Sequence, residues 1–144
     1  MSERFKSAAC VDLLMLKNEN GEIKVLLMRR ANTGDNDGEY ELPGGHLEEN
    51  EDIFDAMIRE AEEELLIKVS KTDLELAHIM HHYSGKRFNF IFKIDSSKFN
   101  PQIGEPEKCD KIEWFNIETL PANLTYKMSK IISNVKNKIL YDKL

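Results

Sequence analysis

The sequence predicts an α+β fold in which a mixed β-sheet lies between helices. Apolar runs of strand length lie on both sides of a central segment whose apolar residues recur at helical spacing. A second segment with helical spacing lies near the C-terminus. At 144 residues the chain has enough material for one proper core, so we expect a single domain over residues 1–144.

The first apolar runs predict a β-hairpin. Residues 5–16 are β-compatible, residues 18–21 have the composition of a turn, and residues 23–28 form the second apolar run. Arg29 and Arg30 follow directly, with side chains on opposite faces of the strand, so one of them can turn towards a phosphate group. A solvated pair at the strand end is the alternative, and both interpretations stay open.

A polar loop and a short strand come next. Residues 32–40, NTGDNDGEY, predict a loop that borders a ligand. An EF-hand calcium loop is excluded by register, because Gly38 at the sixth position puts Thr33 at the first and Gly44 at the twelfth. Residues 41–45 predict a strand that runs into a tight glycine turn.

The central segment predicts an amphipathic helix. Asn50 is a suitable N-cap, and Glu51 and Asp52 place negative charge in the first turn, where the helix dipole favours it. The apolar residues of one stripe are Ile53, Phe54, Met57, Ile58, Ala61 and Leu65.

Three glutamates crowd one side of this helix. At about 100° per residue, Glu60, Glu63 and Glu64 fall within an arc of roughly 100°, and Glu64 lies at the edge of the apolar stripe. Like charges three and four residues apart repel one another, and partial burial raises the cost unless a cation lies among them. Magnesium or manganese is the ion that such oxygens favour. A solvated acidic face, or a surface for a basic partner, is the alternative.

The second half predicts more strands and one more helix. Strand regions are expected at residues 67–69, 74–83, 87–94 and 112–115, and a helix over residues 126–141. Phe88, Phe90 and Phe92 alternate on one strand face, which favours core packing. Neighbouring histidines at His81 and His82 point to opposite strand faces, so a zinc site there is disfavoured.

Composition excludes several classes of protein. The net charge of −6 and the lack of a basic stripe argue against a nucleic-acid polymer as partner. No apolar run is long enough to span a bilayer, and residues 1–10 do not resemble a secretory leader, so we expect a cytoplasmic protein. Cys10 and Cys109 show no metal-type spacing and are expected to be reduced.

The central segment also resembles a known motif. Its motif positions are Gly45, Glu51, Arg59, Glu60, Ala61, Glu63, Glu64, Leu66 and Ile67. Five residues separate Gly45 from Glu51 and seven separate Glu51 from Arg59, and single residues follow Ala61 and Glu64. This resembles the Nudix box, G-x5-E-x7-R-E-U-x-E-E-x-G-U, where U is bulky and aliphatic. Leu66 departs from the pattern, because the family has a glycine there, in the left-handed residue that ends the helix.

The resemblance implies an α/β/α sandwich with a mixed central sheet, and metal-dependent hydrolysis of a nucleoside diphosphate linked to another group. It assigns magnesium, with manganese as the alternative ion, to Glu60, Glu63, Glu64 and the carbonyl of Gly45. It further implies that Arg59 holds carboxylates in place, Glu51 among them. A general base is expected at Glu63 first, with Glu105 and Glu107 as the alternatives in a later loop.

The sequence says less about the identity of the substrate than about the class of reaction. The expected partner is a small phosphorylated nucleotide, and the expected assembly is a monomer or a homodimer. A nucleoside triphosphate, oxidised or otherwise noncanonical, ranks first, giving nucleoside monophosphate and diphosphate. A nucleotide sugar such as ADP-ribose ranks second, and a catalytically weak nucleotide-binding regulatory domain, suggested by Leu66, is the third hypothesis.

Overall fold

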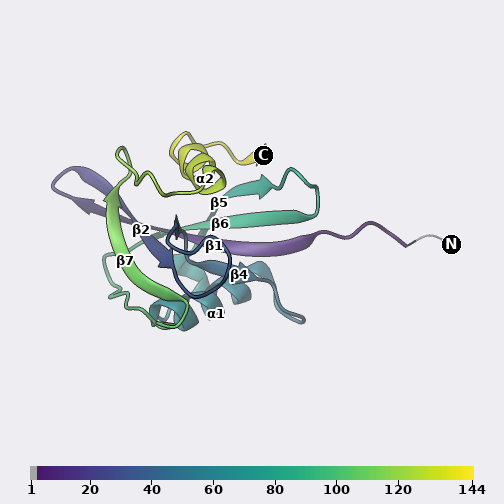
Figure 1. Ribbon diagram of the computed structural model, residues 1–144, viewed down its shortest axis with the longest axis horizontal. Coiled ribbons are helices and arrows are strands. Elements are labelled where there is room, and N and C mark those ends of the chain that lie inside the picture. Colours follow the sequence, from purple (N-terminus) through teal and green to yellow (C-terminus); the bar gives the residue numbers. More distant parts are fainter. Residues whose placement is uncertain (1–2) are drawn as a thin grey trace.

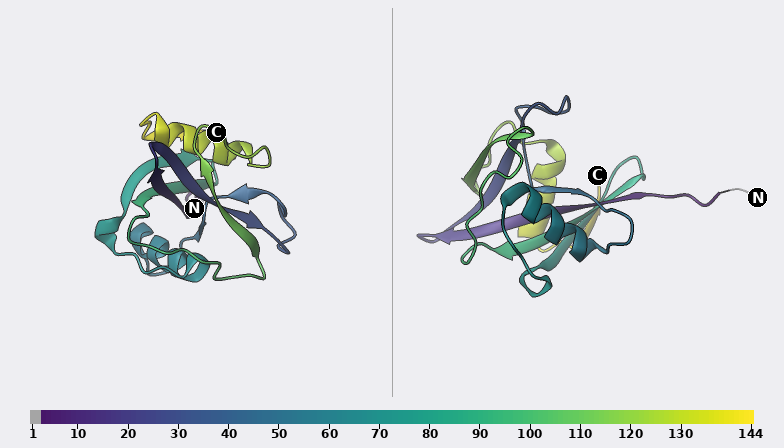
Figure 2. Two further views of the ribbon diagram at one scale, coloured as in Figure 1. Left: turned by 90° about the vertical axis from the view of Figure 1, so that its left-hand side faces the viewer. Right: turned by 90° about the horizontal axis from the view of Figure 1, so that it is seen from below.

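The computed structural model describes residues 3–144, so Met1 and Ser2, which begin the stretch inspected for a leader, lie outside it. Within this range, eight strands form one mixed sheet with a helix on each face. Figures 1 and 2 show α2 on one side of the sheet and α1 on the other. The predicted α/β/α sandwich is therefore confirmed. No helix of residues 3–144 combines the length and the apolar character needed to cross a bilayer.

The elements follow one another in a simple order. The strands are β1 (Ala8–Glu19), β2 (Glu22–Arg30), β3 (Tyr40–Glu41), β4 (Gly44–His46), β5 (Glu75–His81), β6 (Arg87–Asp95), β7 (Cys109–Asn116) and β8 (Tyr141–Lys143). The helices are α1 (Ile53–Leu65), a 3-10 turn (Lys71–Asp73) and α2 (Tyr126–Lys136). Across the sheet the order is β3-β2-β1-β6-β5-β8, with β4 beside β1 and β7 beside β2.

Strand β1 is shared between two partners. Its C-terminal part pairs antiparallel with β2, which confirms the predicted hairpin, and residues Cys10 to Asp12 pair with β4. The expected strand over residues 41–45 is split, because Pro43 lacks the N–H that a continuous ladder needs. Its carbonyl instead accepts the Leu13 N–H at 2.7 Å. This split carries the glycine pair into the sheet beneath α1.

The core has two layers because side chains alternate along the strands. Val11 and Leu13 belong to the apolar cluster under α1, whereas Leu14 belongs to the cluster under α2. Phe90 and Phe92 pack in the α1 layer, as predicted. Phe88, the third aromatic of that alternation, is half-buried and stacks on His81 with ring centroids 4.0 Å apart.

Helix α1 begins differently from the prediction. Its N-cap is Asp52, and Asn50 is instead a turn residue with a φ of 67°. The Asp52 carboxylate accepts the Asp55 N–H at 2.9 Å, and the Asp55 carboxylate accepts the Asp52 N–H at 3.0 Å. This reciprocal capping box satisfies two backbone donors, whereas Asn50 lies too early in the chain to reach them.

Two predicted elements in the second half are wrong: one strand is absent, and one helix is shorter than predicted. Residues 67–69 form no strand, although Ile67 and Val69 are buried in the core. Helix α2 ends at Lys136 rather than at residue 141, because Lys138 turns left-handed and the Ile139 N–H closes back on the Asn134 carbonyl at 2.9 Å. The chain beyond that turn becomes β8, parallel to β5.

The end of α1 keeps a left-handed residue without glycine. Leu66 has φ 55° and ψ 37°, and its side chain is exposed. Two N–H groups of a distant loop complete the helix end: Gln102 donates to the Leu65 carbonyl and Gly104 to the Glu64 carbonyl, both at 2.9 Å. The helix therefore ends where the family pattern requires, at a steric cost of about 1 kcal/mol for a residue with a Cβ.

Replacing Leu66 by glycine should stabilise the protein relative to Leu66→Ala by about 1 kcal/mol, because both variants lose the exposed side chain but only glycine relieves the left-handed strain. Chemical denaturation of both variants measures the difference. An alanine variant as stable as the glycine variant would show that position 66 carries no strain.

Candidate active site

The acidic side of α1 borders a small pocket. The pocket has a volume of about 120 Å³ and lies where α1 meets β2, the glycine turn and the connection before β7. Its walls carry three cations and three carboxylates, namely Arg29, Arg30, Lys108, Glu41, Glu64 and Glu105. Charges of both signs in one concave site are suited to a charged ligand and a metal ion.

Glu64 is the most perturbed acid of the helix. Its carboxylate is half-buried and accepts the Gly44 N–H at 2.9 Å. Burial, with the nearby charge of Glu60, raises the pKa of Glu64 to about 9. Within residues 3–144, Arg30 pairs with Glu41 and Lys108 lies nearest Glu105, and no lysine or arginine forms an ion pair with Glu64. A cation supplied from outside the chain would therefore be the natural compensator.

Glu60 lies deepest of the three glutamates. It is 9% exposed, and its carboxylate packs so closely on Gly45 that a Cβ there would collide with it. Burial raises the pKa of Glu60, and the guanidinium of Arg59 opposes that shift. The glycine at position 45 is therefore required by space, because it lets the backbone approach the carboxylate.

Arg59 joins the carboxylates into one network. Its guanidinium donates to both oxygens of Glu51, at 2.8 and 3.1 Å, and to the His46 carbonyl at 3.0 Å. It also donates to Glu60 at 2.8 Å and, at 3.4 Å, to Glu63. These bonds raise the pKa of Arg59 and lower that of Glu51. The contacts agree with the holding role that the resemblance implies for Arg59.

Glu63 lies on the outer flank of the helix. Its side chain is 47% exposed and does not line the pocket, although Arg59 ties it to the same network. The three glutamates are thus graded from buried Glu60 through half-buried Glu64 to exposed Glu63.

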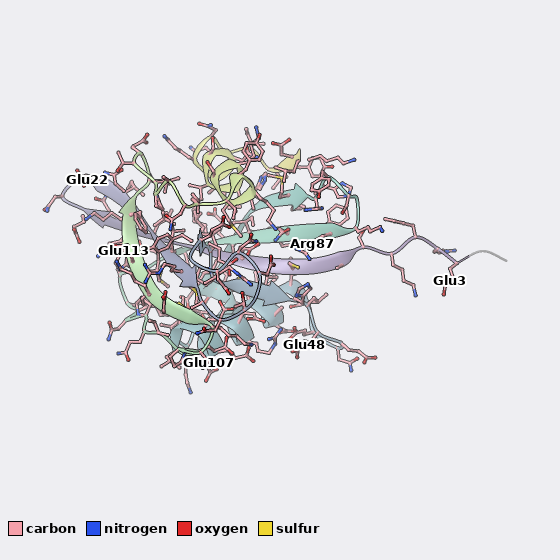
Figure 3. The ribbon with its side chains drawn as sticks, in the orientation of Figure 1. Glu3, Glu22, Glu48, Arg87, Glu107 and Glu113 are labelled. Carbon is pink, nitrogen blue, oxygen red and sulfur yellow. The ribbon has the colours of Figure 1, made fainter. Side chains whose placement is uncertain are left out.

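The connection before β7 contributes one of its two candidate bases. The Gly104 N–H binds the helix end, so Glu105 follows directly into the pocket and adds to the charge that raises the pKa values of Glu60 and Glu64. Glu107 is exposed and lies outside the pocket lining, near the start of β7 (Figure 3). Glu107 as a general base stays a prediction, and its exposed side chain would have to turn from solvent to reach the pocket.

The two arginines of β2 are both engaged. Arg29 makes a bidentate ion pair with Asp110, at 2.7 and 3.1 Å. Arg30 donates to Glu41 at 2.7 Å and to two acceptors of the loop that follows β2. Both residues border the pocket. Arg29 uses two of its five N–H donors on Asp110 and Arg30 uses three, so both guanidiniums keep unused donors.

The side chains do not form a preassembled metal cage. Among residues 3–144, no three His, Cys, Asp or Glu side chains converge closely enough to hold an ion. The donors nevertheless fit a hard divalent cation: they are carboxylate oxygens on a rigid helix, and the half-buried Glu64 forms no ion pair with any other described residue. Substrate phosphates and water usually complete such sites.

Sequence reasoning missed three groups. Glu41 and Lys108 line the pocket, although each sits in a segment that carries no motif. Asp12 is buried on β1, where Asn89 donates to it at 2.7 Å, and burial raises its pKa to about 6. A lone carboxylate inside an apolar strand, as in CVDLLML, was the available signal for Asp12.

Comparison with known proteins agrees with this architecture. A MutT/nudix family protein from Enterococcus faecalis superposes with a TM-score of 0.80 at 21% identity, covering 96% of this chain and 64% of that chain. The present chain thus spans somewhat less than two thirds of that protein. A MutT NUDIX hydrolase from Burkholderia pseudomallei gives 0.74 at 22% identity, covering 90% and 98%. The NUDIX domain of Shewanella oneidensis NrtR, complexed with ADP ribose, gives 0.73 at 18% identity, covering 95% and 90%.

The match to a family model agrees with the fold and with the carboxylate-rich helix. The NUDIX domain family matches residues 6–135. The chain belongs to the Nudix family.

Glu64→Gln should stabilise the metal-free protein at pH 8 but not at pH 5. The folded protein retains the Glu64 proton up to a pKa of about 9, whereas the unfolded chain loses it near 4.5, so wild-type stability falls as pH rises between these values. Glutamine cannot ionise, so at pH 8 the variant should gain at least about 1 kcal/mol. Thermal unfolding in chelator measures this, with the exposed Glu62→Gln as control. A gain that does not grow from pH 5 to pH 8 would contradict the shift.

Proposed function

We propose that this protein hydrolyses a phosphoanhydride bond of a nucleoside diphosphate derivative with the help of magnesium or manganese. A nucleoside triphosphate is the favoured substrate, giving nucleoside monophosphate and diphosphate. The observation that carries the proposal is the half-buried carboxylate of Glu64, with its raised pKa, beside a pocket that also holds Arg30 and Lys108. We treat residues 1–144 as one domain acting in the cytoplasm.

The metal would be held by Glu60, Glu63 and Glu64, assisted by the carbonyl of Gly45. When bound, it supplies charge neutralisation of the phosphates and a lower pKa for the attacking water. Glu63 is exposed in the metal-free chain, and rotation of its side chain from the flank of α1 is required for it to take part. Arg59 keeps the neighbouring carboxylates from separating while they carry like charge.

The proposed hydrolytic step exchanges one bond to phosphorus for another. A water oxygen forms a bond to one phosphorus, the bridging oxygen leaves with the bonding electron pair, and the water proton passes to a base. Glu105 is supported as that base by its place in the pocket wall, whereas Glu63 is supported only by its place in the box. Glu105→Gln distinguishes the two: if Glu105 is the base, this variant loses rate while its metal affinity stays near wild type, and if Glu63 is the base, it keeps the wild-type rate.

A nucleotide sugar is the second candidate substrate. It is supported by the likeness to the NrtR domain, whose structure contains ADP ribose. A panel of nucleoside triphosphates, ADP-ribose and dinucleoside polyphosphates, run in isotopically labelled water with products identified by mass, tests both. Tight binding without turnover of any member would favour the regulatory alternative instead.

Glu63→Gln and Glu64→Gln should each lower kcat by about 100-fold or more, because each loses a metal-binding charge with almost no change in volume. Glu62→Gln is the matched control on the same helix and should keep wild-type rates. Steady-state phosphate or diphosphate release is the measurement. Full activity in both test variants would refute the assigned roles.

Magnesium should raise the melting temperature of the wild-type protein, because a cation that binds only the folded state stabilises it by mass action. At about 100 times its dissociation constant the gain is about 2.7 kcal/mol. Glu64→Gln should show a smaller shift. An unmoved transition at saturating magnesium would mean that the site forms only with substrate phosphates present.

A further inference from the structure

We infer that the pocket beside Glu64 receives a terminal phosphoryl group of the substrate, and that Lys108 and Arg30 bind it. This rests on the proposed function and narrows it to nucleoside polyphosphates that end in a free phosphate, in preference to nucleotide sugars. Lys108 has no role in the Nudix box, which ends at Ile67.

The size of the pocket favours a small group. Its volume of about 120 Å³ compares with roughly 300–1,000 Å³ for sites that enclose a drug-sized ligand. A phosphoryl group fits within that space. Apart from Met28 and Cys109, the lining is made of polar or charged residues and one glycine, so it offers a sugar ring little apolar surface.

Arg30 is oriented before any ligand arrives. Its Nε donates to the Asp35 carbonyl at 2.7 Å, one Nη donates to Thr33 at 3.1 Å, and the other to Glu41 at 2.7 Å. The loop is itself braced, because the Asp37 carboxylate accepts the N–H groups of Thr33 and Gly34, both at 3.0 Å. A guanidinium has five N–H donors, so two remain for a phosphate.

Lys108 combines a fixed backbone with a free ammonium. Its N–H donates to the Glu105 carbonyl and its own carbonyl accepts the Ala31 N–H, both at 2.9 Å, which docks the residue against the end of β2. The ammonium lies 3.9 Å from the Glu105 carboxylate, at the outer limit of an ion pair. It makes no hydrogen bond within residues 3–144, so its donors are available to a ligand.

The positive charges of Lys108 and Arg30 explain why these residues would discriminate between a nucleoside triphosphate and ADP-ribose. A terminal phosphate carries close to two negative charges at neutral pH, since its second pKa is about 6. The terminal ribose of ADP-ribose is neutral and offers the two cations no counter-charge. Lys108 and Arg30 therefore stabilise the bound triphosphate more than the bound sugar.

The test is Lys108→Met, assayed on a nucleoside triphosphate and on ADP-ribose with magnesium. We expect kcat/KM for the triphosphate to fall about tenfold, as for loss of one hydrogen bond to a charged group, and that for ADP-ribose to change by less than about twofold. Calorimetric binding of the α,β-methylene analogue of each substrate should show the same split without turnover.

Two variants serve as controls. Lys108→Arg keeps the charge and should retain triphosphate binding within about threefold of wild type. Lys98→Met removes a lysine of similar exposure, 66% against 63%, from the same connection but outside the pocket, and should leave both substrates unaffected. Melting curves of all variants confirm that they fold.

The inference is overturned if Lys108→Met affects both substrates equally, or neither, or if wild-type protein prefers ADP-ribose. Its failure is distinct from failure of the proposed function. Turnover of ADP-ribose without a triphosphate preference removes the inference and leaves the hydrolase. Absence of turnover for every nucleotide, with a differential loss of analogue binding in Lys108→Met, removes the hydrolase and leaves the pocket assignment.

Discussion

Contact between the glycine turn and α1 is the constraint on which the rest of the site depends. Strand β4 occupies the edge of β1 that β2 leaves, and so presents Gly44 and Gly45 to the helix. One glycine donates its N–H to Glu64 and the other leaves room for Glu60. Two carboxylates are thereby fixed against backbone, in an environment that raises the pKa values of both.

The second constraint is that several carboxylates share the single guanidinium of Arg59. Within residues 3–144, Arg59 is the only cationic side chain paired with Glu51, Glu60 and Glu63, so a single positive charge balances several negative ones. Glu64 is left with the Gly44 N–H and no cationic partner among these residues. Incomplete compensation is unfavourable for the isolated chain, because partly buried like charges repel. It is also what makes the helix attractive to a divalent cation, whose binding completes the balance.

Local sequence patterns predicted what local interactions determine. The periodicity around Glu60 gave the helix, and strand alternation gave the layer that buries Phe90 and Phe92. The missed features depend on contacts between distant segments. Helix α2 stops early where His78, buried on β5, lies 2.7 Å from the Ile139 carbonyl and holds the following residues against the sheet. Lys108 reaches the pocket only because its loop docks on β2, which no spacing rule encodes.

The closure of α1 by a distant loop has an evolutionary consequence. The loop is held to the helix through the backbone N–H groups of Gln102 and Gly104, so the exposed side chains of the loop can change without moving Glu105, while Phe99 and Ile103 pack on the core. Position 104 is the exception, since any larger residue would strike the Glu63 carbonyl. Homologues should therefore vary widely in this stretch while retaining a glycine at that single point.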